Sequence, residues 1–248
     1  MLQPSVAVKV KVWVLPQVPT SVTAPAQSIN RHEGILIDVS GSIGKGGSNK
    51  ELLNEYLRAT KQLLATEPPN SRVWVSVITT DSFGSVRELT KGWTPGTQGV
   101  FTADLNRARR QLAASFEAKS AGLSPVAAGT DIIGALWHIK ALLDSTGTNS
   151  RPQTKEIWIF SDMVNETAAF QMPARVPLGP DLMLERAQAN GLVVPLNGYR
   201  VHVFGASPTG LDPHTWTTVK AFWTLYFRAA GAELSGYSAE STATAERN

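Results

Sequence analysis

The 248-residue chain contains no cysteine, which excludes disulfide bonds, thiolate zinc sites, iron–sulfur clusters and a cysteine nucleophile. It has no apolar run near the ~18–20 residues that a membrane-spanning helix requires. It also lacks a basic cluster, because 23 Lys and Arg stand against 20 Asp and Glu, a net charge of +3. A groove that tracks phosphates normally carries more positive charge, so we do not expect nucleic-acid binding.

The start of the chain shows no basic segment followed by an apolar stretch, so we expect no signal peptide. With the absence of cysteine, this favours a cytoplasmic protein. Residues 1–33 are predicted to form an arm. Its valines from Val6 to Val14 alternate with other residues, as in a half-buried strand, and a proline-rich linker follows. Residues 34–237 are predicted to form the main domain, and residues 238–248 a disordered tail.

Strand-like and helix-like segments alternate in the main domain. Short apolar runs typical of strands buried on both faces of a parallel sheet occur at 34–39, 73–79, 156–160 and 199–204. Helical spacing of apolar residues predicts helices from Ser48, over 102–117, from Thr130, from Pro180 to Gly191 and from Asp212 to Gly231. The alternation predicts a doubly wound α/β fold, with a mostly parallel central sheet and helices on both faces.

Oxygen-bearing side chains follow two of the predicted strands and precede one predicted helix. Asp38-Val39-Ser40-Gly41-Ser42 follows the first strand, Ser161-Asp162 follows the strand 156–160, and Gly129-Thr130-Asp131 leads into a helix. Ligands of such sheets bind at the carboxyl ends of strands, so we expect these side chains to converge there. Two carboxylates and three hydroxyls without nitrogen or sulfur suit Mg²⁺ or Mn²⁺ rather than zinc or copper.

These three segments resemble the metal-ion-dependent adhesion site of von Willebrand factor A (vWA) domains, and the order of elements is similar over roughly residues 33–237. The resemblance implies a Rossmann-like vWA fold in which the segment 84–93, despite its poor apolar pattern, is an antiparallel edge strand. It also implies a non-enzymatic module, used in adhesion or complex assembly, that captures an Asp or Glu of a partner protein through bound Mg²⁺ or Mn²⁺. The implied metal ligands are Asp38, Ser40, Ser42, Thr130 and Asp162.

Each of these residues also has an ordinary structural interpretation. Asp38 and Asp162 could satisfy loop amides in turns, and Thr130 could cap the helix that it precedes. A second functional hypothesis is a metal-dependent hydrolase, for example of phosphoesters, that uses the same cation as a Lewis acid. This hypothesis lacks an obvious general base, because no His or Lys accompanies the ligands in the motif.

Other parts of the sequence carry weaker signals. The glycine-rich stretch 41–48 does not match a phosphate-binding loop, because Gly46 follows Lys45 where a hydroxyl is required. Phe170 and Met172 either contact a partner or fold back onto the domain. Structural roles are expected for the four histidines, and Trp13 and Trp93 are the tryptophans expected to be exposed.

Overall fold

The computed structural model describes residues 30–40, 49–85, 87–96, 101–125, 129–145, 153–172, 178–206 and 212–240. The described strands are β1 (Asn30–Asp38), β2 (Ser71–Ile78), β3 (Arg87–Trp93), β4 (Gln153–Phe160), β5 (Tyr199–Phe204) and β6 (Glu233–Tyr237). The described helices are α1 (Asn49–Ala65), α2 (Thr102–Ser120), α3 (Ile132–Asp144), α4 (Pro180–Ala189) and α5 (Pro213–Ala229). None of these helices has both the length and the apolar character needed to cross a membrane.

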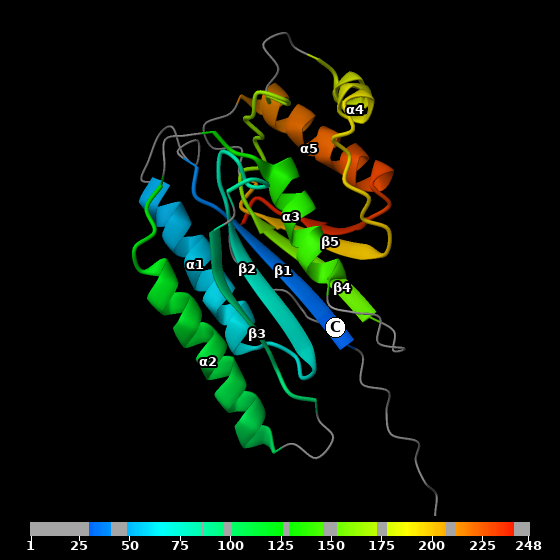
Figure 1. Cartoon of the computed structure of the whole chain (residues 1–248). Coiled ribbons are helices and arrows are strands. Elements are labelled where there is room, and N and C mark those ends of the chain that lie inside the picture. Colours follow the sequence, from blue (N-terminus) through cyan, green and yellow to red (C-terminus); the bar gives the residue numbers. More distant parts are fainter. Residues whose placement is uncertain are drawn as a thin grey trace, which may run out of the picture.

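The described strands form one sheet in the order β3-β2-β1-β4-β5-β6 (Figure 1). β3 runs antiparallel to β2, and every other pair of neighbours is parallel. β1 therefore lies inside the sheet, with β2 on one side and β4 on the other. This arrangement confirms the predicted doubly wound, mostly parallel sheet with one antiparallel edge strand.

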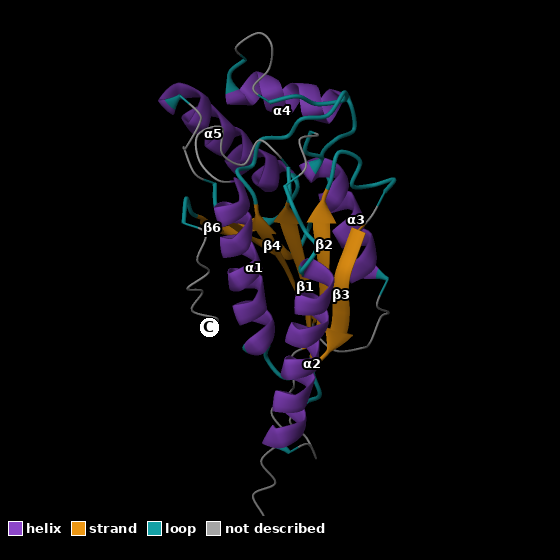
Figure 2. Cartoon of the chain, turned by 90° about the vertical axis from the view of Figure 1, so that its left-hand side faces the viewer, coloured by secondary structure: helices purple, strands orange, loops and turns teal. Residues whose placement is uncertain are grey.

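Helices cover both faces of the sheet, with α1 and α2 on one face and α3, α4 and α5 on the other (Figure 2). The side chains of β4 alternate between the two apolar clusters: Ile157 and Ile159 contact the α3 side, and Trp158 and Phe160 contact the α1 side. All four are almost completely buried. Burial of such a side chain stabilises the fold by about 1.5–3 kcal/mol, which explains why the strand reads as a continuous apolar run.

The central strand is longer than its apolar run. β1 includes residues 30–33, which the sequence assigned to the arm, so that boundary is corrected. Polar side chains in this part of β1 are paired: Arg31 lies 3.3 Å from the fully buried Glu33 and 3.6 Å from Glu156 of β4. Ion pairing lets polar residues continue a buried strand, and an apolar pattern does not detect them.

The two edge strands have weak sequence patterns because much of each strand is accessible to solvent. In β3, only Leu89 and Thr90 are buried, which accounts for the poor apolar pattern of the predicted edge strand. β6 was not predicted at all, since its sequence Glu-Leu-Ser-Gly-Tyr has no fully buried member. An edge strand needs little apolar surface, so periodicity alone does not identify it.

Residues 238–240, which the sequence assigned to the disordered tail, belong to the folded domain, so that boundary is corrected as well. The backbone N–H of Ser238 donates to the carbonyl of Val203 at 2.9 Å, and the N–H of Gly205 donates to the carbonyl of Glu240 at 2.9 Å. These hydrogen bonds attach the chain after β6 to the end of β5. The arm before residue 30 and the tail after residue 240 lie outside the described residues.

Two open points about aromatic and apolar side chains are settled by burial. Phe170 and Met172 fold back onto the domain, with exposed fractions of 4% and 0%, and Phe170 stacks on Phe222 at 5.2 Å between ring centroids. Trp93 is 66% exposed, as expected. Trp13 lies outside the described residues.

Candidate metal centre

The predicted site lies at the carboxyl edge of the parallel strands, between β1 and β4. The chain leaves β1 toward β2 on one side, whereas β4 pairs with β1 on the other side, which makes this point the topological switch of the sheet. Ile37 and Phe160 are opposite each other in the register, so Asp38 and Ser161 follow at adjacent positions. Asp162 comes directly after. Two of the predicted ligands are thus delivered by neighbouring strands.

Asp38 is fully buried at the end of β1. Its Oδ1 accepts a hydrogen bond from the backbone N–H of Ser40 at 2.8 Å, and its Oδ2 accepts one from Ser161 Oγ at 2.6 Å. Burial raises the pKa of Asp38 despite these hydrogen bonds, and the charge of Glu166 raises it further. The negative charge of this carboxylate is therefore poorly solvated, and a cation beside it would compensate the cost.

Asp162 is held in a tight turn after β4. Its Oδ1 accepts a hydrogen bond from the backbone N–H of Val164 at 2.9 Å. Between them, Met163 adopts a left-handed conformation with φ of 65°, which few residues other than glycine adopt without cost. The carbonyl of Met163 accepts a hydrogen bond from Trp223 Nε1 of α5 at 2.7 Å. The turn that orients Asp162 is thus fixed from the α5 side.

Tyr56 of α1 connects the two carboxylates electrostatically. Its ring is fully buried, and its hydroxyl donates to the carbonyl of Gly205 at 3.2 Å. Burial is the main cause that raises the pKa of Tyr56 well above its usual value, and the charges of Asp38 and Asp162 both add to it. This agrees with the strand register, in which Asp38 and Asp162 follow the adjacent ends of β1 and β4.

The loop before α3 crosses above β1. The N–H of Asp131 donates to the carbonyl of Thr79, just after β2, at 2.8 Å. The carbonyl of Thr130 accepts a hydrogen bond from the N–H of Glu166, after β4, at 2.7 Å. Because β1 lies between β2 and β4, these two bonds hold Thr130 over the end of the strand that carries Asp38.

Asn165 ties this loop to the turn after β4. Its fully buried side chain accepts hydrogen bonds through Oδ1 from the N–H groups of Ile132 and Ile133 at 2.9 and 3.3 Å, which satisfies the first turn of α3. Its Nδ2 donates to the carbonyl of Phe170 at 2.6 Å. Asn165 thus positions the segment of Thr130 relative to the segment of Asp162.

The side chain of Thr130 does not cap the helix. Asp131 is the N-cap, and its Oδ1 accepts a hydrogen bond from the N–H of Gly134 at 2.8 Å. Thr130 itself is fully buried, and its Oγ1 has no hydrogen-bond partner among the described residues. A buried hydroxyl without a partner costs about 1–3 kcal/mol. A buried oxygen left in this state, in a loop at the edge of the sheet where Asp38 lies, fits a cation ligand.

The outcome differs between the predicted ligands. The structure brings Asp38, Ser40, Thr130 and Asp162 to one edge of the sheet, and Ser42 lies outside the described residues. Among the described residues, no group of three or more His, Asp or Glu side chains could hold a metal ion. A cation in this place would therefore depend on hydroxyl ligands, and the ligand assignments remain predictions.

Sequence reasoning missed three residues that organise this edge. Ser161 was quoted only as a neighbour of Asp162, because its bond to Asp38 depends on the pairing of β1 with β4. Asn165 and Glu166 belong to a loop without a motif, and their roles follow from contacts with α3 and with Thr130. The one available signal was their position in the segment that follows a buried strand.

No protein-family model and no curated protein sequence matches this chain. Among solved structures, the PilB minor pilin from Streptococcus sanguinis is similar, with a TM-score of 0.53 and 16% identity over 87% of this chain and 59% of that chain. The SpRpn10 VWA domain has a TM-score of 0.45 and 10% identity, over 86% of this chain and 90% of that one. Manganese-loaded Plasmodium vivax TRAP protein has a TM-score of 0.41 and 16% identity, over 85% and 68%.

Of these three structures, PilB alone has a TM-score above 0.5, and at 16% identity it indicates a similar fold and nothing more. The likeness to PilB agrees with the six-stranded sheet and its flanking helices. The chain covers only part of PilB, so no property of that protein is transferred. The fold class is therefore established by the topology itself.

Proposed function

We propose that this chain is a vWA-type module that binds Mg²⁺ or Mn²⁺ through Asp38, Ser40, Ser42, Thr130 and Asp162. Through the metal it would capture an Asp or Glu side chain of a partner protein. The observation that carries the proposal is the buried hydroxyl of Thr130, which has no hydrogen-bond partner among the described residues. Backbone hydrogen bonds hold its segment between the ends of β2 and β4, the two strands that flank the strand of Asp38.

The donor set fits a small hard dication. Carboxylate and hydroxyl oxygens are the ligands that Mg²⁺ and Mn²⁺ prefer. When bound, a cation held partly by neutral hydroxyls would retain enough positive charge to attract a further carboxylate. The protein side supplies orientation: Ser161 fixes the Asp38 carboxylate, and Asn165 fixes the loop of Thr130.

The hydrolase hypothesis requires a general base or a nucleophile beside the metal. Two of the histidines are placed elsewhere: His32 lies near the beginning of β1, and His202 stacks on Trp158 at 4.2 Å within the sheet. Neither position favours catalysis at the carboxyl edge. We propose binding rather than hydrolysis, and turnover of a generic phosphoester that depends on Asp38 would reverse this choice.

Isothermal titration calorimetry with Mg²⁺ and Mn²⁺ tests the metal step. We expect saturable binding to the wild type and none to Asp38→Asn, with Asp181→Asn as the control because Asp181 is an exposed aspartate of α4. Equal binding by all three proteins would contradict the proposal. The partner step is tested by pull-down with and without chelator, and capture that does not respond to chelator would contradict recognition through the metal.

A further inference from the structure

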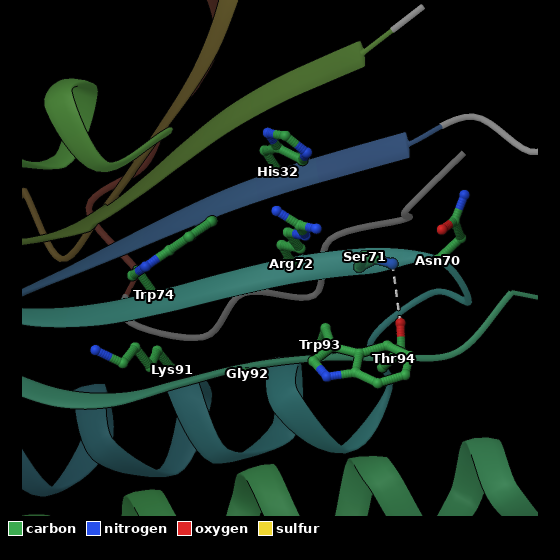
Figure 3. A pocket seen from close by; sticks show the side chains of 9 residues that line it. All are labelled: His32, Asn70, Ser71, Arg72, Trp74, Lys91, Gly92, Trp93 and Thr94. Carbon is green, nitrogen blue, oxygen red and sulfur yellow. Dashed lines mark hydrogen bonds between the residues drawn. The ribbon is translucent and has the colours of Figure 1, made fainter. Parts of the chain in front are cut away.

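A second candidate site lies at the other end of the sheet. A cavity of about 580 Å³ is formed by the beginnings of β1 and β2 and the end of β3 (Figure 3). His32, on the β1 side of this cavity, is six positions before Asp38 in β1, which corresponds to about 20 Å along a strand. The cavity is within the size range of ligand pockets, roughly 300–1,000 Å³. It is thus separate from the candidate metal centre.

The cavity lies on the face of the sheet that α3 covers in part. Val73 and Val75 of β2 point into the cluster below α1 and α2, so Arg72 and Trp74 point to the opposite face. α3 packs against β1, where a Cβ added to Gly34 would lie 2.2 Å from Ile139 Cγ1. Toward β3 this cover ends, since Trp93 is two-thirds exposed.

Two cations and two tryptophans alternate on this surface. Arg72 is opposite Trp93, and Trp74 is opposite Lys91, in the antiparallel pair of β2 and β3. The N–H of Thr94 donates to the carbonyl of Ser71 at 2.9 Å, so these two residues form a hydrogen-bonded pair of the antiparallel ladder. Hydrogen-bonded and non-hydrogen-bonded pairs alternate along such a ladder, so both cation–tryptophan pairs are non-hydrogen-bonded pairs. Side chains are closest at such positions, which gathers the four groups into one patch.

Arg72 gives the patch a positive charge that no described carboxylate neutralises. No described carboxylate forms an ion pair with Arg72. Lys91 lies 3.3 Å from Glu88, but both side chains are accessible to solvent, and such a pair contributes little. Burial and the nearby charges of Arg72 and Lys155 lower the pKa of His32, which therefore stays neutral at neutral pH. The surface fits an anionic ligand.

The arm of this chain does not complement this surface. Residues 1–29 contain Lys9 and Lys11 and neither Asp nor Glu, so like charges would meet. A nucleic acid needs a longer track of cations than two side chains supply. Tryptophan and arginine gathered in one patch are instead the typical energetic centre of a protein–protein interface.

We propose that Arg72, Trp74, Lys91 and Trp93 form a docking surface for an acidic segment of a partner protein, with an Asp or Glu next to an apolar side chain. The carboxylate would bind the guanidinium of Arg72, and the apolar side chain would pack on the exposed ring of Trp93. This docking needs no metal, so it does not depend on the proposed function of the carboxyl edge.

The experiment is selection of short random peptides, displayed on phage, on the immobilised full chain in the presence of EDTA. We expect enrichment of peptides that combine Asp or Glu with an apolar residue. Binding of a selected synthetic peptide should weaken about tenfold or more in Trp93→Ala and in Arg72→Ala. Phe101→Ala, which removes another exposed aromatic ring on a different element, should leave the affinity unchanged.

Three results would overturn the proposal: no enrichment, enriched peptides without acidic residues, or peptides that bind all variants equally. In a second experiment, binding of an oligothymidylate probe to the same proteins is measured. If no acidic peptide is enriched, and the wild type binds the oligonucleotide but Trp93→Ala and Arg72→Ala do not, the surface is assigned to nucleic acid instead. Urea unfolding of each variant shows that it folds, and Arg72→Lys separates the need for charge from the need for the planar guanidinium.

Discussion

Thr130→Val tests the candidate centre through opposite effects on the metal-free and the metal-bound protein. Valine keeps the branched shape of threonine and replaces the buried hydroxyl by a methyl group. Because Thr130 Oγ1 has no hydrogen-bond partner among the described residues, its removal should raise the free energy of unfolding of the metal-free protein by about 1–3 kcal/mol. For a domain of this size each kcal/mol corresponds to roughly 2–4 °C in Tm.

The same substitution removes a proposed ligand, so it should reduce the stabilisation that Mg²⁺ gives. At a Mg²⁺ concentration of about 100 times Kd, the free energy of unfolding of the wild type should be about 2.7 kcal/mol higher than in EDTA. The corresponding increase for Thr130→Val should be clearly smaller. Urea unfolding followed by tryptophan fluorescence, with Mg²⁺ and with EDTA, measures both effects.

Thr60 of α1 provides the matched control. It is also fully buried, and its Oγ1 also lacks a hydrogen-bond partner among the described residues. Thr60→Val should raise the stability in EDTA as well, but it should leave the Mg²⁺ increment unchanged. The reasoning is refuted if Thr130→Val lowers the stability in EDTA, or if Mg²⁺ stabilises it as much as the wild type.

Three further predictions concern the framework. Asn165→Ala should lower the free energy of unfolding by about 1–3 kcal/mol, because it leaves two buried N–H groups of α3 without their acceptor, and urea unfolding would show no change if the contact were unimportant. Although burial opposes it, hydrogen bonds from two lysines and a tyrosine hold the pKa of Asp144 well below its usual value of 3.8, so stability should be lost as pH falls below about 4. Asp144→Asn should show a smaller loss in urea midpoints measured against pH, and parallel curves would contradict this assignment. Gly34→Ala should lower the free energy of unfolding in urea by about 1–3 kcal/mol, because the added Cβ would lie 2.2 Å from Ile139 Cγ1. Gly122→Ala is the control, because no atom lies within 4 Å of a Cβ added there, and an equal loss in both variants would contradict the prediction.

The buried parallel strands were predictable because burial on both faces requires apolar residues throughout. β5 coincides with its predicted range, and β4 contains the whole of its apolar run. The start of β1 escaped prediction because Arg31 and Glu33 are polar and become compatible with the sheet only through pairing with each other and with Glu156. A run of apolar residues in the sequence identifies a buried strand, but it does not reveal an ion pair between two strands.

The candidate site was predictable as a set of residue types, but not as a network. The positions of Asp38 and Asp162 after predicted strands and of Thr130 before a predicted helix, together with the resemblance, pointed to these residues, and the sheet order places their segments at one edge. The bond from Ser161 to Asp38 and the role of Asn165 depend on contacts between segments far apart in the chain. No spacing along the sequence encodes such contacts.

The most direct test of the central claim is an anomalous difference map from crystals of this protein grown with Mn²⁺. We predict one strong peak about 2 Å from Thr130 Oγ1, within coordination distance of Asp38 or Asp162 directly or through one water molecule. A map without a peak at this edge, or with manganese bound only elsewhere, would contradict the account.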